Sequence, residues 1–596
     1  MPSVTCDPQT TRSARSATTR RITRTTTPPW RRRVGASLVA LSLVVVLTMS
    51  LAGVAGAKET TTTAATSQPK VYPASGHGTA LAHGIVDMAK LPILQPHAVT
   101  SAQTLPLPAP DALTPAQRQA YNDKARKATS TSLPGAATKT PQGVSPSFVG
   151  GGAMPLLVKQ FDGLNSAQVG GGTGNAAIAT DLSYVMEGVD NAIAIYSATS
   201  GAKLYGPYSP ASFFAPVYHA GDLFAYPQMY YDTMRDRWIV AYLEVAPSHT
   251  VTYLDVAISK TTSPTQPTPG AQYNVYQFDT NFEGTPKINS YCDYETLGVD
   301  YWGVYITCVN YRNFTFVGNT ALAINKAPLL TGAANPQTYW WDDALKITSD
   351  AGPALELSPA IEEGVQDAEF IIATDAGYGV SSHNLSVCAL TNQSNIATVA
   401  PTLSCLHANF PYDYFEPAPA IQPGGPPIAV GYGTKQVYYK AGRLFLAWTS
   451  ALEYGDAIEL AEVRPILDYS NIPQMYDVEI TQYSAMFGIG QVYANTPSIV
   501  GTDEDDVVLV YNSSGPSRYP GLYYTGRKAS NRLGLMGPET PVVTGTHATT
   551  AYWAKYSACA ISLNSVTRGG VWCVGEYTGL TPDPGWNTRL FNLRAE

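Results

Sequence analysis

From Phe148 onward, short apolar and aromatic runs alternate with Gly, Pro, Asn and Asp, a pattern typical of strands and turns. No long stretch of this region has the 3.6-residue periodicity of a helix. The segment Pro227–Tyr242 reads as a short strand, a polar turn and an apolar strand, and Pro359–Thr374 and Pro497–Tyr511 repeat the pattern. The sequence therefore contains an internal repeat built from strands.

The spacing of the copies predicts the number of repeats. Pro227 and Pro359 are 132 residues apart, and Pro359 and Pro497 are 138 apart, close to two periods of about 66 to 69 residues. Seven units of four short strands fit a β-propeller better than a sandwich or a solenoid, because one such unit cannot bury both of its faces alone. We therefore predict an all-β fold, a propeller of seven four-stranded blades over residues 148–596, with six or eight blades as alternatives. Weaker copies lie near Ala179, at Tyr294–Thr307, at Gln436–Thr449 and from Ser557 to Tyr577.

Residues 1–57 have the features of a targeting segment. Eight arginines between Arg12 and Arg33 precede the uncharged run Val34–Ala57, which ends in Ala-Gly-Ala. A basic flank, an apolar stretch and a small-residue site together predict a signal peptide. The run is also long enough to span a bilayer, so an uncleaved membrane anchor is the alternative.

Residues 58–147 are rich in Thr, Ala and Pro and contain almost no aromatic residues. Such a composition cannot bury a core, so we predict a disordered N-terminal stalk or linker, with a pro-segment as the alternative. One short helix is expected near residues 115–128, with Thr114 as the N-cap and Pro115 at the first helical position.

Six cysteines follow the predicted leader and form three close pairs separated by 16, 17 and 14 residues. Each interval fits one β-hairpin, and none has the Cys-x-x-Cys spacing of a zinc site. We therefore predict nearest-neighbour disulfides, which are typical of secreted proteins. The predicted pairs are Cys292–Cys308, Cys388–Cys405 and Cys559–Cys573.

The charge of the chain argues against nucleic acid as a partner. Without the leader, which holds eight of the 37 Lys and Arg and one of the 45 Asp and Glu, the net charge changes from −8 to −15. An excess of acidic residues disfavours nucleic acid and anionic membrane surfaces. The mature chain is expected to have no membrane span unless the leader stays attached. Charged residues make up only 14% of the sequence, which suits an exported protein and raises the hypothesis of an acidic habitat.

The segments Pro227–Tyr242, Asp255–Lys260, Tyr519–Arg527 and Trp586–Arg589 resemble an uncharacterised family of exported bacterial β-propeller proteins. The resemblance covers most of residues 170–596 and implies the propeller fold, but no activity. A looser likeness to sialidase-type propellers lacks two sialidase motifs, the Asp-box and the Arg-Ile-Pro segment that begins the arginine triad.

Carboxylates are the residues on which glycan chemistry would depend. Glycoside cleavage needs two or three of them, one with a raised pKa as the acid and another as base or nucleophile. In the alternative interpretation, Asp232 and Asp293 cap turns and Glu576 pairs with an arginine. The candidates in or beside predicted strands are Asp232, Asp293, Glu295, Glu363 and Glu576.

Calcium is the one cofactor that the sequence suggests. Asp503, Asp505 and Asp506 lie in one acidic run, and hard cations take several carboxylate oxygens. A solvated hairpin turn is the alternative. The histidines are scattered without a zinc motif, and the glycine-rich runs lack the lysine of a phosphate-binding loop.

The sequence leaves three functions open. The first interpretation is a non-catalytic exported propeller that binds a carbohydrate or protein at or outside the cell surface. The alternatives are a glycan-active hydrolase or lyase, and a structural coat protein. An enzyme should gather two or three acids at one mouth of the propeller channel, whereas a binding module should present an aromatic or polar face without them.

Overall fold

The computed structural model describes residues 69–95 and 154–594, with gaps at 172, 249, 266–271, 281–289, 313–314, 343–355, 375–381, 432, 453–454, 487–491, 503–504, 532–534, 550–552, 554, 563–569 and 580–584. Most of these residues belong to strands, so the predicted all-β class is confirmed. Nowhere in the described ranges does a helix reach the length and hydropathy that a membrane span requires. The helical elements there are short: η1 (Met88–Lys90), α2 (Ser166–Val169), α3 (Pro210–Phe213), α4 (Lys326–Thr331) and η2 (Gln393–Asn395).

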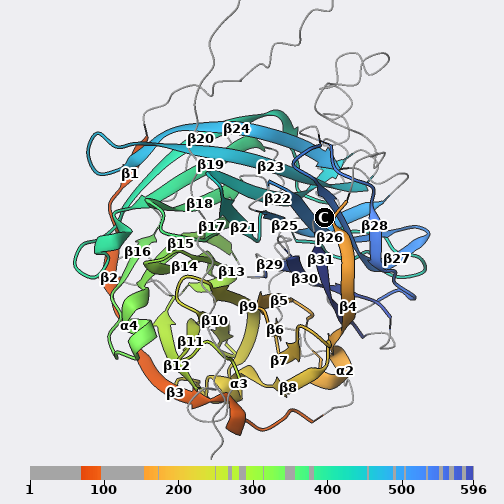
Figure 1. Cartoon of the computed structure of the whole chain (residues 1–596), viewed down its shortest axis with the longest axis horizontal. Helices are drawn as coiled ribbons and strands as arrows, with labels where there is room; N and C mark the ends of the chain where they lie inside the picture. The colour runs from red at the N-terminus through yellow and green to blue at the C-terminus, as the bar shows by residue number, and fades with distance from the viewer. Residues whose placement is uncertain are drawn as a thin grey trace, which may run out of the picture. The chain divides into compact units, whose positions relative to one another are not determined.

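Four smaller sheets consist of antiparallel strands (Figure 1). The first sheet contains β5 (Ala177–Thr180), β6 (Tyr184–Val189), β7 (Ala192–Ser197) and β8 (Lys203–Tyr208). The second contains β9 (Leu223–Asp232), β10 (Arg237–Val245), β11 (Thr252–Ser259), β12 (Gln272–Asp279) and β3 (Ala82–Asp87). The third contains β25 (Tyr493–Gly501), β26 (Val507–Gly515), β27 (Arg518–Arg527) and β28 (Thr540–Val543). The fourth contains β29 (Ala558–Ile561), β30 (Gly570–Tyr577), β31 (Asn587–Arg594) and β4 (Leu156–Asn165).

The remaining sheet is 14-stranded and consists of three antiparallel runs. Short parallel pairings join the runs, at Val299 with Ile361 and at Ala360 with Val437. The first run contains β13 (Tyr291–Val299), β14 (Gly303–Arg312), β15 (Thr315–Asn325), β16 (Thr338–Asp342) and β2 (Gly76–Gly78). The second contains β17 (Glu356–Glu362), β18 (Ala368–Thr374), β19 (Ser382–Thr391), β20 (Thr402–Tyr414) and β1 (Lys70–Tyr72). The third contains β21 (Val437–Lys440), β22 (Arg443–Leu452), β23 (Gly455–Asp468) and β24 (Gln474–Met486).

The repeat copies read from the sequence lie on hairpins of these sheets. Pro227–Tyr242 covers most of β9 and β10, Pro359–Thr374 covers β17 and β18, and Pro497–Tyr511 covers the equivalent parts of β25 and β26. The polar residues in the middle of each copy form the turn. Strands in the middle of a sheet such as β10 are buried over nearly their whole length, because apolar side chains pack on both faces.

The first strands of successive runs contact one another. We call β5, β9, β13, β17, β21, β25 and β29 the inner strands. Each contacts the next in this order, and β29 contacts β5 (Figure 1). The inner strands therefore bring residues from distant parts of the sequence together.

Residues 70–87 lie within the predicted linker and yet form strands. The strands β1, β2 and β3 pair with β20, β16 and β12, which are the last strands of three successive runs. An edge strand has unpaired N–H and C=O groups, and a short segment of almost any composition can satisfy them. The predicted leader, the predicted helix near residues 115–128 and the rest of the linker lie outside the described residues.

One substitution tests whether β3 stays bound to β12. Val86 is buried and Ile85, its neighbour, is 55% exposed. We expect Val86→Asp to detach β3, because a charged group would have to be buried, and to raise the rate of proteolysis within residues 69–95 by about tenfold or more. Ile85→Asp is the matched control and should leave the rate unchanged. Equal rates for both variants, measured by limited proteolysis and mass spectrometry, would contradict a docked strand.

The sheet that contains β29 joins distant parts of the chain, because its fourth strand is β4. Leu590 of β31 pairs with Phe161 of β4. Glu187 of β6 lies beside this pair of strands and accepts hydrogen bonds from the Leu164 N–H at 3.1 Å, from the Tyr196 hydroxyl at 2.8 Å and from the Thr588 hydroxyl. Burial raises the pKa of Glu187 to about 7. This carboxyl therefore links the first sheet to the one that β4 completes.

All three predicted disulfides are confirmed: Cys292–Cys308, Cys388–Cys405 and Cys559–Cys573. Each one joins two adjacent strands, β13 to β14, β19 to β20 and β29 to β30. The short intervals in the sequence therefore correspond to single hairpins.

Candidate functional site

Side chains from six parts of the chain meet near the N-terminal ends of the inner strands. We call them the inner-strand cluster. Glu356 is the first residue of β17, and Lys435 and Tyr556 each precede an inner strand by two residues. No member is more than 6% exposed. The members are Asp190, Tyr226, Asp293, Tyr294, Glu295, Glu356, Lys435 and Tyr556.

Three tyrosines and a lysine form the aromatic part of the cluster. The ring centroid of Tyr226 lies 5.4 Å from that of Tyr294 and 5.4 Å from that of Tyr556. The Lys435 ammonium lies 4.6 Å from the centroid of Tyr294 and 5.4 Å from that of Tyr556. Its Nζ also lies 2.5 Å from a carboxylate oxygen of Glu356. The one lysine of the cluster is thus already paired with an acid.

Asp190 and Asp293 are held by backbone N–H groups. The Tyr226 N–H donates to Asp190 at 3.0 Å, and the Tyr294 N–H donates to Asp293 at 2.9 Å. Asn175 donates a further bond to Asp190 at 3.2 Å. Burial raises the pKa of Asp190 to about 6 and that of Asp293 to about 7, because a buried carboxylate loses its hydration.

Glu295 is the third acid of this group, and it is fully buried on β13. Neither carboxyl oxygen has a hydrogen-bond partner among the described residues. Burial, followed by the nearby carboxyls of Asp190 and Asp293, raises the pKa of Glu295 well above its usual range. Asp190, Asp293 and Glu295 therefore form a group of acids with no basic side chain in ion-pair contact in the described part of the chain.

The backbone at two tyrosines of the cluster is strained. Tyr226 has a φ of 50° and Tyr294 a φ of 51°, in the left-handed region that bulky residues rarely adopt. A register shift lies beside each of them, and Thr496 on β25 repeats the arrangement with a φ of 55°. Such conformations cost about 1–3 kcal/mol each and occur often at functional sites.

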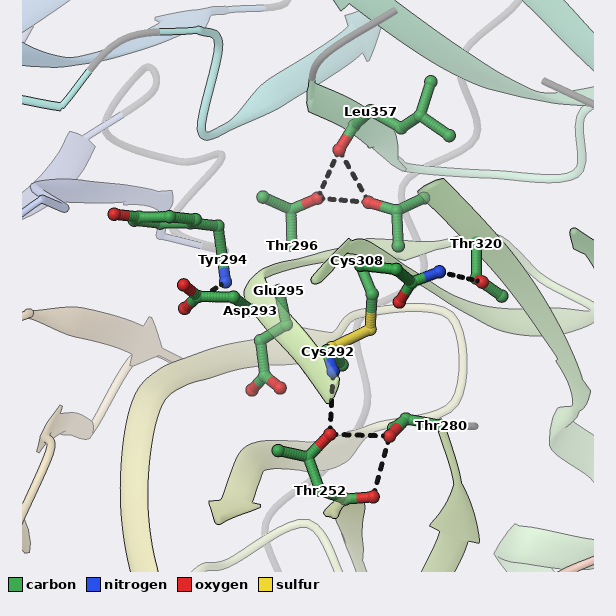
Figure 2. The surroundings of a disulfide bond; sticks show 12 residues. Thr252, Thr280, Cys292, Asp293, Tyr294, Glu295, Thr296, Cys308, Thr320 and Leu357 are labelled. Atoms are coloured by element: carbon green, nitrogen blue, oxygen red, sulfur yellow. Dashed lines mark hydrogen bonds between the residues drawn. A yellow bond between two sulfur atoms is a disulfide. The ribbon is translucent and has the colours of Figure 1, made fainter. Parts of the chain in front are cut away.

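The disulfide of β13 lies directly before the acidic residues of that strand. Figure 2 shows Asp293, Tyr294 and Glu295 in the segment that follows Cys292. The Cys292 N–H donates to the Thr252 hydroxyl at 2.8 Å, so β13 is also tied to the second sheet. The covalent bond and this hydrogen bond fix the strand at the point where it contributes to the cluster.

Two of the acids predicted from the sequence lie at the opposite ends of the inner strands. Asp232 is the last residue of β9 and pairs with Lys326 at 2.5 Å. Glu363 follows β17 and pairs with Lys440. Each of these acids therefore has its own lysine, as Glu356 does and as Asp190, Asp293 and Glu295 do not among the described residues. Asp293 and Glu295 are the predicted candidates that the structure brings together.

The other predicted residues lie elsewhere. Glu576 is buried on β30, where a Cβ at Gly174 would lie 2.8 Å from its Oε1. Asp505 pairs with Arg443, and Asp506 accepts the Ala529 N–H at 2.7 Å. Asp503 lies outside the described residues. The described calcium candidates thus contact an arginine and a backbone amide, and calcium stays a prediction.

Sequence reasoning did not select six members of the cluster as site residues: Asp190, Tyr226, Tyr294, Glu356, Lys435 and Tyr556. Linear spacing carries no signal for them, because they come from different runs of strands. The repeat does carry one signal. Tyr226 directly precedes Pro227, the first residue of one repeat copy, and Thr496 directly precedes Pro497, the first residue of another. Both residues lie at a register shift, so a comparison of these two copies could have identified the position.

One group in the described ranges has the composition of a metal site. It contains His219, Asp222 and Glu244, whose potential ligand atoms all lie within 4.8 Å of one another. It belongs to the second sheet and to the loop before β9, and it includes none of the acids predicted from the sequence.

No protein-family model and no curated protein matches the chain. An ulvan lyase bound to -[GlcA(1-4)Rha3S]- is similar in structure, with a TM-score of 0.33 and 11% identity over 68% of this chain and 91% of that one. An exo-β-1,3-galactanase from Phanerochaete chrysosporium has a TM-score of 0.28 and 10% identity over 74% and 99%. A protein of unknown function from Dyadobacter fermentans has a TM-score of 0.28 and 14% identity over 63% and 96%. These similarities are too remote to support an argument about activity.

Proposed function

We propose that the protein is an exported seven-bladed β-propeller that cleaves glycans at the inner-strand cluster. The observation that carries the proposal is the meeting of Asp190, Asp293 and Glu295, with no basic side chain in ion-pair contact among the described residues, beside three tyrosine rings. The gathering of two or three acids near one end of the inner strands is the feature that favours an enzyme over a binding module.

The contacts of the inner strands support the closed propeller. Each of the seven inner strands starts one antiparallel run, and the contacts return from β29 to β5. The pairing of β31 with β4 supplies the fourth strand of the run that starts with β29. Three disulfides support export, because such bonds persist in oxidising compartments.

The raised pKa values support acid–base chemistry. In the proposed reaction Asp293, with a pKa of about 7, keeps its proton near neutral pH and donates it to the glycosidic oxygen. Asp190, with a pKa of about 6, is ionised near neutral pH and acts as the base or the nucleophile. The tyrosine rings offer flat apolar faces of the kind on which sugar rings stack.

The test is polysaccharide cleavage by the full chain without its leader. A panel of neutral and uronate-containing polysaccharides is incubated with the protein, and new reducing ends and unsaturated uronate are measured. We expect Asp293→Asn and Asp190→Asn each to lower the rate by about 100-fold or more. The parent rate should peak between about pH 6 and 7, the acidic limb following Asp190 and the basic limb following Asp293.

Glu459 of β23 provides the matched control. It is buried, its pKa is raised by burial to about 7, and it accepts a hydrogen bond from Tyr483 outside the inner-strand cluster. Glu459→Gln should keep the parent rate. Cleavage that survives both aspartate substitutions would overturn the assignment of the site.

A receptor for glycans or proteins is the second candidate. One observation favours a receptor over an enzyme: the side chains of the inner-strand cluster are at most 6% exposed, which leaves little of the acids for a bound glycan to contact. Binding of an intact glycan that is unchanged by Asp293→Asn would support this function. Large self-assemblies without glycan binding, detected by light scattering, would instead support a structural coat.

A further inference from the structure

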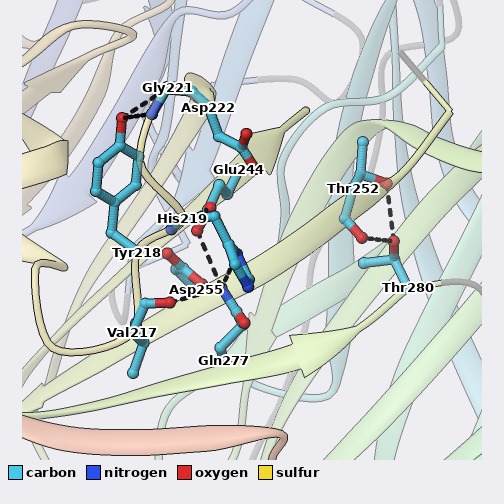
Figure 3. A network of polar contacts seen from close by, with 10 residues as sticks. All are labelled: Val217, Tyr218, His219, Gly221, Asp222, Glu244, Thr252, Asp255, Gln277 and Thr280. Atoms are coloured by element: carbon cyan, nitrogen blue, oxygen red, sulfur yellow. Dashed lines mark hydrogen bonds and ion pairs between the residues drawn. The ribbon is translucent and has the colours of Figure 1, made fainter. Parts of the chain in front are cut away.

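The loop before β9 and the strands β10 and β11 bring together a histidine and three carboxylates (Figure 3). His219 and Asp222 belong to the loop between α3 and β9, and Glu244 lies near the end of β10. The Nδ1 atom of His219 lies 3.0 Å from Oε1 of Glu244. The potential ligand atoms of the three residues lie within 4.8 Å of one another. Ligands of one Zn²⁺ ion lie about 2 Å from the metal and hence about 3–4 Å apart, so only a small inward movement is needed.

The loop is held in place by its own hydrogen bonds. The Gly221 N–H donates to the Tyr218 hydroxyl at 2.9 Å, and that hydroxyl donates to the Asp222 carbonyl at 3.1 Å. The His219 N–H donates to Glu244 at 2.8 Å, and the His219 ring stacks on Tyr253 with centroids 4.5 Å apart. Contacts within the protein thus hold the loop, the His219 ring and the Glu244 carboxylate in place.

A fourth carboxyl, that of Asp255 on β11, supplies an independent observation. Asp255 is fully buried, and its Oδ2 has no hydrogen-bond partner in the described parts of the chain. Figure 3 shows Asp255 beside Glu244 and His219. A buried oxygen without a partner therefore lies at the site.

The site also has more acceptors than donors. The Gln277 amide has two hydrogens, but its nitrogen lies 3.0 Å from Glu244 Oε2, 3.2 Å from Asp255 Oδ1 and 3.1 Å from the Val217 carbonyl. At least one of these oxygens therefore receives no hydrogen from Gln277. A cation would satisfy the excess of oxygens.

We propose that His219, Asp222 and Glu244 bind one divalent transition-metal ion, Zn²⁺ or Mn²⁺, with Asp255 as a further oxygen ligand. One imidazole nitrogen with several carboxylate oxygens suits these ions better than Ca²⁺, which prefers an all-oxygen shell. The His219 side chain is 49% exposed, so the ion has a path from solvent and room for a water ligand. The bound ion would tie the loop before β9 to β10 and β11, next to the strand that carries Tyr226.

The test is metal binding by the full chain without its leader after dialysis against EDTA. Calorimetric titration with ZnCl₂ and with MnCl₂ gives affinity and stoichiometry, and elemental analysis checks the bound metal. We expect one ion per chain, and His219→Ala should weaken binding by about 100-fold or more. Since His219 is at the surface, this variant should keep the parent circular dichroism spectrum.

The exposed pair of His383 with Asp413 is the matched control, because its Nδ1–Oδ1 distance is 3.3 Å but it forms no three-ligand group within the described ranges. His383→Ala should bind the metal like the parent chain. Glu244→Gln provides a second variant and should weaken binding as His219→Ala does. The proposal is overturned if neither metal binds stoichiometrically, or if His219→Ala and His383→Ala bind equally well. Glycan cleavage is not part of this readout.

Discussion

Stability should fall by several kcal/mol between about pH 5 and pH 8. Four buried carboxyls are responsible: burial raises the pKa of Glu187, Asp293 and Glu459 to about 7 and that of Asp190 to about 6. In the unfolded chain these groups release their protons near pH 4, so the folded state binds more protons in the interval. Their stabilisation is complete below the unfolded pKa and is lost as the pH rises through the folded pKa.

The magnitude follows from the size of each shift. A carboxyl whose pKa changes from 4.5 to about 7 on folding contributes roughly 3 kcal/mol to the difference. Because four buried carboxyls shift in the same direction, the loss of stability with rising pH is the largest effect that we expect. The measurement is the free energy of unfolding in urea at several pH values from about 4.5 to 8.5. Glu459→Gln should flatten the profile, whereas Glu479→Gln, at a 37% exposed side chain, should not. A profile that rises towards pH 8 would contradict the prediction.

Asp232→Asn should destabilise the fold by about 3–5 kcal/mol, because it leaves the Lys326 ammonium buried without its counter-charge. The Lys326 side chain is 0% exposed, and its Nζ lies 2.5 Å from Oδ2 of Asp232. The other carboxylate oxygen accepts the Met234 and Arg235 N–H groups in the turn, and asparagine can retain these bonds. The predicted loss is therefore mainly that of the buried ion pair.

A double substitution separates charge from packing. Lys326→Met in the Asp232→Asn background should recover more than half of the loss, because the unpaired charge is then gone. The surface pair of Arg464 with Glu479 is the control, and Arg464→Met should cost less than about 1 kcal/mol. The stability of all three variants is measured from their urea midpoints. If Asp232→Asn abolished glycan cleavage but kept full stability, the active site would have to lie at the other end of the inner strands.

The sequence predicted the features that depend on local pattern. Strand pairs such as β9 and β10 follow from an apolar run, a polar turn and a second apolar run. The disulfides follow from intervals that match one hairpin. The paired strands of residues 70–87 did not follow, because they are short, lie in a Thr-, Ala- and Pro-rich segment, and pair with strands far away in the sequence.

The site was predicted only in part, for a physical reason. The sequence pointed to Asp293 because it lies on a predicted strand. Asp190, the second acid of the proposed reaction, lies in a turn of another sheet. Both carboxyls act on Tyr226 and Glu295, and Tyr226, in its left-handed conformation, donates its N–H to Asp190. A tyrosine in that conformation is held by the surrounding structure, and no local sequence rule predicts it.

The pairing of β4 with β31 sets the order in which the protein can fold. The sheets of β5–β8 and β25–β28 can assemble from consecutive hairpins as the chain is synthesised, but β4 must wait until residues 587–594 have been made. Contacts of such long range are slow to form. A chain that lacks residues 587–594 would leave the edge of β4 open to other molecules, so its aggregation should increase.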